Sequence, residues 1–169
     1  TCFPRDTKAF RALYSKYLGP SPFVESIDFV NEYQHDNLYR IVIENVNKNS
    51  KICILGLSFK PDTTVVVESP AIELAKRLLK NNVKVSGFDP LASSTAADAI
   101  DNDNFIIYDS IDECVSNCDV FVIATPWKNF MNIETLFPKN SVVIDCWRIL
   151  DELNLSNEIK YIPLGKNLT

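Results

Sequence analysis

Glycine is scarce in this chain, which contains only four among its 169 residues. A dinucleotide-binding βα turn normally reads G-x-G-x-x-G, because the pyrophosphate must approach bare backbone. The corresponding turn here, residues 55–60, reads LGLSFK, with one glycine and a bulky phenylalanine. A standard dinucleotide-binding turn is therefore absent from this sequence.

Other absences exclude further classes of protein. The formal charge is −5 and the lysines are scattered singly, whereas nucleic-acid binding needs clustered Lys and Arg. No apolar run approaches the roughly 20 residues that a membrane-spanning helix needs. No charged and then apolar signal segment is visible at the start. We expect a cytoplasmic protein that binds neither nucleic acid nor membrane.

Paired cysteines and multiple histidines are also missing. The cysteines are five in number, at positions Cys2, Cys53, Cys114, Cys118 and Cys146. Cys114 and Cys118 are close in sequence, but no second pair or histidine accompanies them, so we expect no metal site. Cys53 and Cys146 lie in apolar runs, where cysteine behaves as a small buried hydrophobe. The single histidine, His35, has no catalytic partner and is expected on a surface or interface.

The first part of the chain has helical spacing of apolar residues. Residues 7–18 predict a helix with Asp6 as its N-cap, and Gly19 and Pro20 end it. A second helix is predicted over residues 23–47, about 37 Å long. Such a length exceeds the width of a small domain, so we expect this helix to pack against a partner. The alternative is a helix buried only within its own chain.

From residue 51 onward, buried strands alternate with helices. The expected strands are residues 52–57, 83–88, 105–108, 120–124 and 142–145, with helices at 70–81, 93–100, 111–117 and 130–136. Ser69 before Pro70 is a helix start signal, and Ser110 with Glu113 forms a capping-box pattern. This order predicts an α/β, Rossmann-like, doubly wound and mainly parallel sheet. We expect a helical segment at 1–48 and the Rossmann-like domain at 49–169.

Two groups of residues are suited to chemistry. Cys2 and Asp6 are four residues apart at a helix start, which places both on one face, and a helix N-terminus favours the thiolate. Arg5 adds positive charge nearby. A thiolate with a carboxylate is a coherent pair for covalent catalysis. The alternative is an ordinary cysteine near a chain end.

The second group follows the strands, where ligands of open α/β sheets bind. Lys60 could neutralise a diphosphate or bond a sugar hydroxyl, or be an ordinary surface lysine. Arg148 could meet an anion, or pair with Asp145 or Asp151. Asp89 precedes a proline and is better explained as a turn residue than as a ribose-binding acid. Trp127 lines a pocket or packs under its loop.

Together these segments resemble the C-terminal part of the UDP-glucose/GDP-mannose dehydrogenase family. Residues 1–6, TCFPRD, are similar to the family's G-G-S-C-F-P-K-D. Residues 54–70 are similar to I-L-G-L-A-F-K-P-x-T-D-D-V-R-E-S-P. Residues 83–90, 119–127 and 143–151 resemble V-x-V-x-x-Y-D-P, D-x-x-v-i-x-T-x-W and the D-G-R-R/N segment. The resemblance runs through the whole chain in the right order.

The resemblance implies an NAD-dependent oxidation of the C6 alcohol of a nucleotide sugar to a carboxylate. Cys2 would be the nucleophile and Asp6 the acid that assists water. Phe59 and Lys60 would hold the UDP-sugar, and the helix at 23–47 would form a homodimer. The C-F-P form of the cysteine motif favours the UDP-glucose branch. The main NAD-binding domain lies outside this sequence, so we expect an inactive fragment.

Two positions depart from the family pattern. Val67 replaces an arginine that reaches the cofactor, and a valine cannot do the work of a guanidinium. Trp147 replaces a second arginine, whose role the neighbouring Arg148 could take over. Arg5, beside the cysteine, is the remaining residue expected to contact the cofactor. These departures leave open a second hypothesis, a non-catalytic module for nucleotide-sugar binding or dimerisation.

Overall fold

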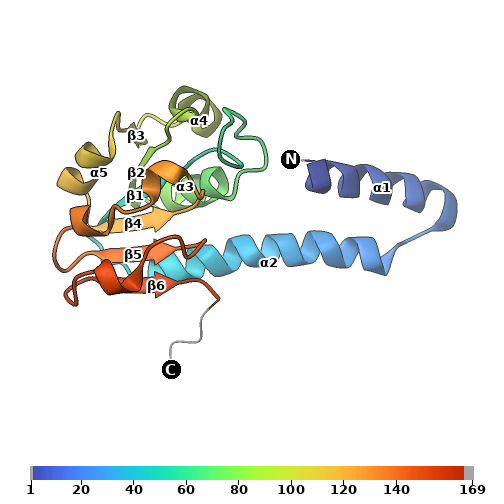
Figure 1. Ribbon diagram of the computed structural model, residues 1–169. Helices are drawn as coiled ribbons and strands as arrows, with labels where there is room; N and C mark the ends of the chain where they lie inside the picture. Colours follow the sequence, from blue (N-terminus) through green and yellow to red (C-terminus); the bar gives the residue numbers. More distant parts are fainter. Residues whose placement is uncertain (1, 166–169) are drawn as a thin grey trace.

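Six parallel strands form the centre of the protein in the computed structural model, which describes residues 2–165 (Figure 1). They are β1 (Lys51–Leu55), β2 (Lys84–Phe88), β3 (Ile106–Ile107), β4 (Val120–Ile123), β5 (Val142–Asp145) and β6 (Lys160–Pro163). Their order in the sheet is β3-β2-β1-β4-β5-β6. The predicted Rossmann-like fold is confirmed, since the order reverses between β1 and β4 and all pairings are parallel.

Alternating side chains of the strands build a separate core on each face of the sheet. Ile52 and Ile54 of β1 belong to the cluster beneath the long helices. Cys53 and Leu55 belong to the cluster on the opposite face. Because successive residues of a strand point to opposite faces, a run that is apolar throughout is buried on both.

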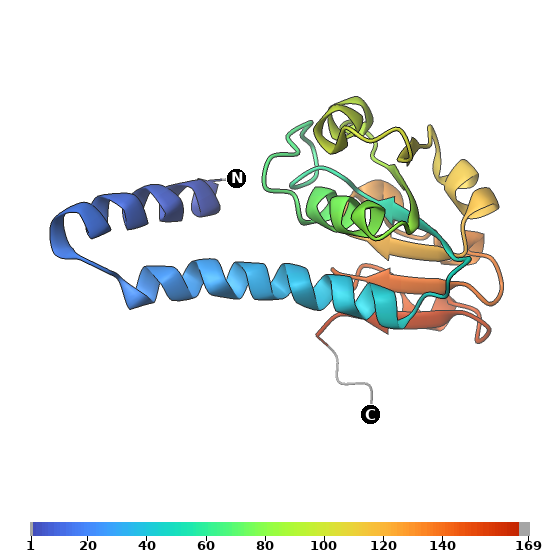
Figure 2. The ribbon, with the colours of Figure 1, turned by 180° about the vertical axis from the view of Figure 1, so that it is seen from behind.

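Helices cover both faces (Figures 1 and 2). The first face is covered by α3 (Pro70–Lys80), α4 (Ser93–Ile100) and the last turns of α2 (Pro22–Glu44), where Leu38 and Val42 are buried in the core. The second face is covered by α5 (Ile111–Asn117) and the short 3-10 turns η1 (Lys128–Phe130), η2 (Glu134–Leu136) and η3 (Glu152–Asn154). A three-layered α/β/α domain results.

A helical hairpin projects from this domain (Figure 2). It consists of α1 (Cys2–Leu18) and the first turns of α2, and Arg11 bridges the two helices by an ion pair of 2.8 Å with Asp28. The start of α1 returns to the domain, where Lys8 forms an ion pair of 2.9 Å with Glu68. The predicted long helix is thus confirmed, although it ends at Glu44 and not at residue 47.

Three local predictions need correction. Asp6 is not an N-cap, because α1 already begins at Cys2 and Asp6 lies inside it; Pro4 is tolerated there, since the first turn has no partners for its N–H groups. The helix predicted at 130–136 is only the turns η1 and η2, separated by Asn132 with a left-handed φ of 62°. Strand β6 was not predicted.

The helix-start signals are borne out in part. Ser110 accepts the N–H of Glu113 at 3.2 Å, but the Glu113 carboxylate accepts from Asp109 and not from Ser110 itself. Ser69 occupies the cap position of α3, yet its hydroxyl donates to the carbonyl of Leu57 at 2.8 Å. Within residues 2–165, no helix is long and apolar enough to cross a bilayer. The boundary between a helical segment at 1–48 and a Rossmann-like domain at 49–169 stays a prediction.

Candidate functional site

The first βα turn is held closed by a neighbouring strand end. Gly56 follows β1 with a φ of 89°, and a Cβ atom there would lie 2.5 Å from the Cβ of Thr125. The Thr125 hydroxyl donates to the carbonyl of Ser58 at 2.7 Å. The single glycine of this turn therefore serves close packing against the end of β4, because any other residue would collide with Thr125.

A buried carboxylate occupies the N–H groups of the same turn. Asp89, only 2% exposed, follows β2, and its Oδ2 accepts the N–H of Leu57 at 2.8 Å and of Ser58 at 2.9 Å. The Ser58 hydroxyl and the indole N–H of Trp127 also donate to Oδ2, at 2.9 and 3.1 Å. In a dinucleotide-binding domain the N–H groups of this turn face a pyrophosphate. Here the protein's own carboxylate takes that place, so the turn does not fit NAD.

The other oxygen of Asp89 holds its own turn. Oδ1 accepts the N–H groups of Leu91 and Ala92 at 2.9 and 2.8 Å. Asp89 is thus a turn residue, as the sequence suggested, and it also joins three loops. Burial by itself raises the pKa of Asp89, but the N–H donors of Ser58, Leu91 and other backbone groups lower it more, so the net pKa lies below its ordinary value.

A second buried carboxylate organises the end of β5. Oδ1 and Oδ2 of Asp145 accept the N–H groups of residues 147–150 at 2.7–3.1 Å, and the hydroxyl of Tyr161 donates to Oδ2 at 3.0 Å. Asp145 therefore pairs with the backbone of Arg148, whose φ is 57°. The side chain of Arg148 is exposed to solvent at the carboxyl end of the sheet.

The two family departures are both at this edge. Trp147 takes the place of the arginine of the D-G-R-R/N segment; its indole N–H donates to the carbonyl of Ala124 at 2.9 Å, and 53% of the residue is exposed. Val67 is 64% exposed. The role of Thr125 could not be predicted from the sequence, because its partner Ser58 lies 67 positions away. Asp145 was predicted as a partner of Arg148, and the structure shows that it binds the backbone of this residue and of its neighbours.

The loop that carries Lys60 lies beside the start of α1. Phe59 is half-buried, and Lys60 is exposed and makes no ion pair with any described residue. The Lys8–Glu68 ion pair fixes α1 to the end of this loop, and a hollow of about 390 Å³ lies between them. Both sequence segments with candidate residues therefore meet at one end of the domain (Figure 1).

The helix start itself carries Cys2, Arg5 and Asp6. The side chain of Cys2 lies outside the described residues. Arg5 and Asp6 are exposed and form an ion pair with each other at 3.1 Å. Among the described side chains, no cluster of His, Cys, Asp or Glu is suited to hold a metal ion.

Comparison with known proteins now decides the family. The model of the UDP binding domain of the UDP-glucose/GDP-mannose dehydrogenase family matches residues 53–152. The chain belongs to this family. The matched range contains the turn at Gly56, both buried carboxylates and Trp147, so the geometry described above is that of the family's UDP binding domain.

Relatives extend the similarity to the helical hairpin. Two proteins called UDP-glucose 6-dehydrogenase, from Rickettsia felis and Rickettsia typhi, are 29% and 30% identical over 99% of this chain. The chain spans 39% and 41% of their lengths. A UDP-glucose dehydrogenase structure from Pyrobaculum islandicum aligns over 96% of the chain and 36% of its own, with 28% identity and a TM-score of 0.76. The GDP-mannose dehydrogenase of Pseudomonas aeruginosa, 20% identical, has the same fold over 95% of the chain and 38% of its own, with a TM-score of 0.76.

Replacing Asp89 by Asn tests the anchoring role of this carboxylate. Both oxygens of the Asp89 carboxylate accept N–H groups, and in asparagine an NH2 group would face one of these sets of donors and leave it unpaired. We therefore expect a loss of about 2–4 kcal/mol in the free energy of unfolding at pH 7. Because the folded-state pKa is lowered, the stabilisation is complete above about pH 4 and is lost as the pH falls through the lowered pKa. Denaturant unfolding at several pH values measures the difference between the two proteins.

The matched control is Asp98→Asn, a substitution of an exposed aspartate on α4. We expect it to change stability by less than about 0.5 kcal/mol. Equal effects of the two substitutions, or a difference from wild type that stays constant down to acid pH, would contradict the anchoring role of Asp89.

Proposed function

We propose that this chain is the C-terminal part of a UDP-sugar 6-dehydrogenase, with UDP-glucose as the sugar nucleotide. The observation that carries the proposal is the match of the whole chain, from the C-F-P motif to the last strand, to proteins called UDP-glucose 6-dehydrogenase. The domain binds the substrate, and NAD is held mainly by a domain outside this chain. The chain alone is inactive.

In this proposal, the diphosphate is recognised by side chains. The backbone N–H groups of the first turn are already bonded to Asp89, so they cannot hold a phosphate. Lys60 is an exposed cation at the carboxyl end of β1 without an ion pair among the described residues, and Phe59 lies next to it. Arg148 supplies a second cation at the same edge, after β5. Parallel sheets bind their ligands at this edge.

Cys2 and Asp6 act on the sugar. The backbone of α1 begins at Cys2, and the positive end of a helix dipole favours the thiolate. The C6 alcohol is first oxidised to the aldehyde. The Cys2 thiolate attacks the aldehyde carbon to give a thiohemiacetal, and oxidation of this adduct, the second oxidation of the sugar, leaves a thioester. Asp6 assists the water that hydrolyses the thioester, so the acid is released and the thiol is restored. Two molecules of NAD in turn would supply the oxidising power, one for each oxidation, and Arg5 is the cation of this motif that would contact the cofactor.

The second candidate is a non-catalytic module that binds nucleotide sugar or dimerises. Val67 and Trp147 favour it, because both reach solvent where the family pattern has arginines. The two candidates differ in the fate of Cys2. Only the enzyme needs its thiol.

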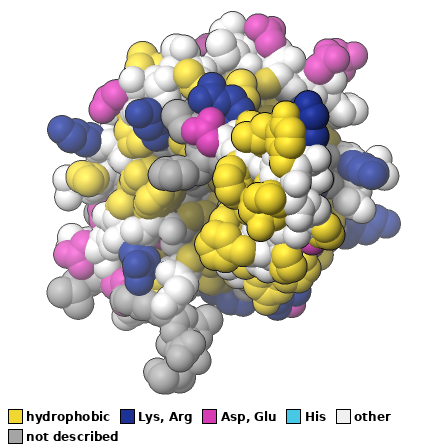
Figure 3. Space-filling model, turned by 90° about the vertical axis from the view of Figure 1, so that its right-hand side faces the viewer, with side chains coloured by type: hydrophobic (Ala, Val, Ile, Leu, Met, Phe, Trp, Pro, Cys, Tyr) yellow, Lys and Arg dark blue, Asp and Glu magenta, His cyan; other side chains and the backbone are white. Residues whose placement is uncertain are grey.

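A homodimer through the hairpin completes the proposal. Several large apolar side chains of α1 and α2 are exposed: Phe10, Leu13, Tyr17, Leu18, Phe23, Phe29, Val30 and Tyr33. Figure 3 looks onto the end of the molecule from which the hairpin projects, and hydrophobic side chains gather there. Contiguous apolar surface of this kind is typical of protein interfaces. A second copy of the hairpin offers the same surface and can cover it symmetrically.

The role of Lys60 is tested by titrating the 169-residue chain with UDP in a calorimeter. We expect Lys60→Ala to weaken binding about tenfold, because one charge-assisted bond to the diphosphate is lost. Lys48→Ala, at an exposed lysine before β1, is the matched control and is expected to bind UDP like wild type. An unaltered affinity of the Lys60 variant removes this residue from the site.

The role of Cys2 is tested in the full-length protein that contains this chain. We expect Cys2→Ser to abolish the release of sugar acid, since the serine hydroxyl stays protonated at neutral pH and does not form the thioester that water hydrolyses. UDP affinity should stay unchanged, which controls for folding of the domain. Release of sugar acid at the wild-type rate excludes the covalent mechanism, and an inactive wild-type protein that binds UDP supports the module.

The dimer is tested by sedimentation of the same chain over a range of concentrations. Wild type should have a two-chain mass, and Phe29→Glu should raise the dissociation constant at least about tenfold, because a charge would be buried in an apolar interface. Asn31→Glu adds the same charge at an exposed polar position of α2 and serves as control. A wild-type monomer at every concentration contradicts the dimer.

A further inference from the structure

Three cysteine side chains meet on the sheet face that is covered by α5. Cys53 belongs to β1, Cys114 to α5, and Cys118 follows the end of α5. All three are buried in one core cluster as free thiols. Cys53 is the register partner of Ser86, whose Oγ lies 3.3 Å from the Cys118 Sγ, so Cys53 and Cys118 lie close together in this cluster. The sequence, which has only Cys114 and Cys118 near each other, does not reveal this contact.

Cys118 is surrounded by groups that can donate to its sulfur. The Ser86 Oγ lies 3.3 Å from the Cys118 Sγ and 2.9 Å from the carbonyl oxygen of Ile52. The Ser86 hydroxyl carries one hydrogen, so it turns to the sulfur when the sulfur is charged. Tyr108 lines the same groove as Cys118, and its hydroxyl favours the charged form of the thiol. Bonds from Cys53, Ser86 and Tyr108 outweigh burial and the nearby Asp119, and they lower the pKa of Cys118 to about 7.

Cys118 is also the thiol of the three that reaches an opening. It is 8% exposed, whereas Cys53 and Cys114 are fully buried. It lines a groove of about 670 Å³ at the amino ends of β1 and β2, together with Ser86 and Tyr108. The groove exists because β3 pairs only with residues 86 and 87 of β2, which leaves the beginning of β2 without a neighbour on that side.

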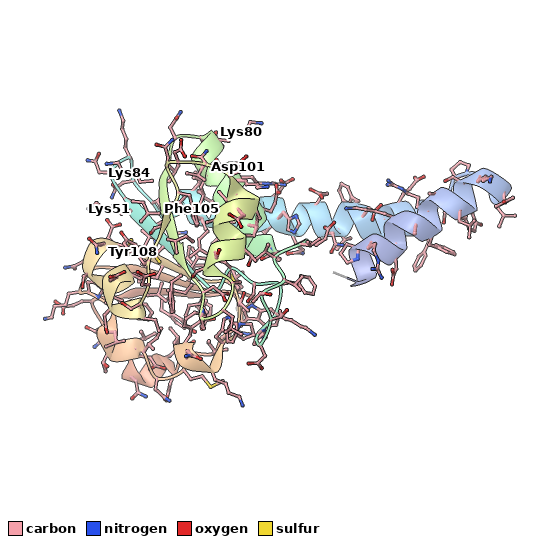
Figure 4. The ribbon with its side chains drawn as sticks, turned by 90° about the horizontal axis from the view of Figure 1, so that it is seen from above. Lys51, Lys80, Lys84, Asp101, Phe105 and Tyr108 are labelled. Atoms are coloured by element: carbon pink, nitrogen blue, oxygen red, sulfur yellow. The ribbon has the colours of Figure 1, made fainter. Side chains whose placement is uncertain are left out.

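Two cations stand at the mouth of this groove. Lys51 and Lys84 are register partners at the starts of β1 and β2, and both are exposed without an ion pair to a described residue. Figure 4 shows both lysines and Tyr108 at the end of the domain opposite the hairpin. Asp103 also lines the groove. With Asp119 beside Cys118, the two lysines face two carboxylates, so the groove as a whole is not positive. The lysines are nevertheless the charged groups at its mouth, where they attract small anionic reagents.

Cys146 gives an internal comparison. It lies half-buried after β5, and burial followed by the neighbouring charge of Asp145 raises the pKa of its thiol to about 12. A raised pKa keeps the thiol protonated and unreactive at neutral pH. Burial likewise raises the pKa of Cys53, so Cys118 is the thiol of its cluster that reacts first, and Cys53 can act only on a Cys118 that is already oxidised. One domain thus contains an activated cysteine and cysteines that are unreactive by themselves.

We propose that Cys118 is a site of oxidative thiol modification, with hydrogen peroxide as the oxidant and Cys53 as the thiol that resolves the product. The Cys118 thiolate attacks one peroxide oxygen, the O–O bond breaks, and the hydroxide that leaves takes a proton to become water. The sulfenic acid on Cys118 is then attacked by the sulfur of Cys53, which loses its proton. An S–S bond forms, the S–O bond breaks, and a second water leaves.

The two sulfur atoms give up two electrons, and the peroxide is reduced to two waters, so the sequence is balanced. The site lies at the amino ends of the strands, whereas the candidate substrate residues lie at the carboxyl ends. The inference is therefore independent of the function proposed above. It concerns thiols that the dehydrogenase chemistry does not use.

The test uses the 169-residue chain with Cys2→Ser, so that the chain-end thiol does not react. After treatment with one equivalent of hydrogen peroxide at pH 7 and blocking with iodoacetamide, peptide mass spectrometry should find a Cys53–Cys118 disulfide before any oxidation of Cys146. In Cys53→Ser the sulfenic acid should persist on Cys118 and be trapped by dimedone. Cys146→Ser, the matched control, should leave the disulfide yield unchanged.

Each other outcome overturns the proposal. Oxidation of Cys146 as fast as that of Cys118 shows that Cys118 is not activated. A Cys118 that goes directly to sulfinic acid in the unsubstituted cluster excludes Cys53 as the resolving thiol. If Cys53→Ser does not fold, the alkylation rates of the unsubstituted cluster decide: Cys118 should react with iodoacetamide at least about tenfold faster than Cys146.

The lysines are tested with two reagents that differ only in charge. Substituting Lys51 and Lys84 by Gln together should slow the reaction of Cys118 with iodoacetate about fivefold, because attraction of the anion is lost. The reaction with neutral iodoacetamide should change less than about twofold. Equal slowing with both reagents means that the groove has changed shape, and it removes the lysines from the proposal.

Discussion

The buried carboxylate of Asp89 is the interaction on which the carboxyl edge of this sheet depends. It receives hydrogen bonds from the turn after β1, from its own turn after β2 and from Trp127 after β4. These three loops flank the point where the strand order reverses. A buried charge is stable only when its hydrogen-bonding capacity is satisfied. The loops must therefore keep their positions for Asp89 to remain buried, and Asp89 must remain charged for the loops to hold.

This arrangement explains how a Rossmann-like fold serves a purpose other than dinucleotide binding. The fold brings N–H groups to the first βα turn, where they normally meet a pyrophosphate. In this chain they meet Asp89, and Gly56 is packed against Thr125. In the function proposed above, recognition of a nucleotide sugar falls to side chains around the edge, of which Lys60 is the exposed cation nearest to the turn in sequence. Asp145 has the same role after β5, because its buried carboxylate accepts backbone N–H groups of the loop that carries Arg148.

The two ends of the strands have different chemistry. At the carboxyl ends, satisfied carboxylates fix loops, and the thiol of Cys146 beside Asp145 is kept inert. At the amino ends, the short pairing of β3 leaves a groove, and the thiol of Cys118 is surrounded by donors and faces Lys51 and Lys84. The same residue type is thus inert at one end and activated at the other. Each cysteine has a neighbouring aspartate that raises its pKa, so the difference lies in the side-chain hydrogen bonds that favour the thiolate of Cys118 and are absent from the causes acting on Cys146.

The sequence by itself determined the family, the strands from residues 51 to 145, and the helices that cover them, because apolar periodicity and turn residues act over a few neighbouring positions. It predicted the absence of a dinucleotide turn from the missing glycines. It failed where the decisive partners are distant in sequence. Asp89 bonds to Leu57 across 32 positions, and Cys53 of β1 shares a core cluster with Cys118, which follows α5. It also failed at residues 130–136, where a single helix was predicted. The buried residues there belong to two separate short turns, Phe130 to η1 and Glu134 to η2. Only the tertiary structure decided which carboxylates are buried, which thiol is activated and where the two candidate segments meet, since each of these depends on contacts that chain order does not record.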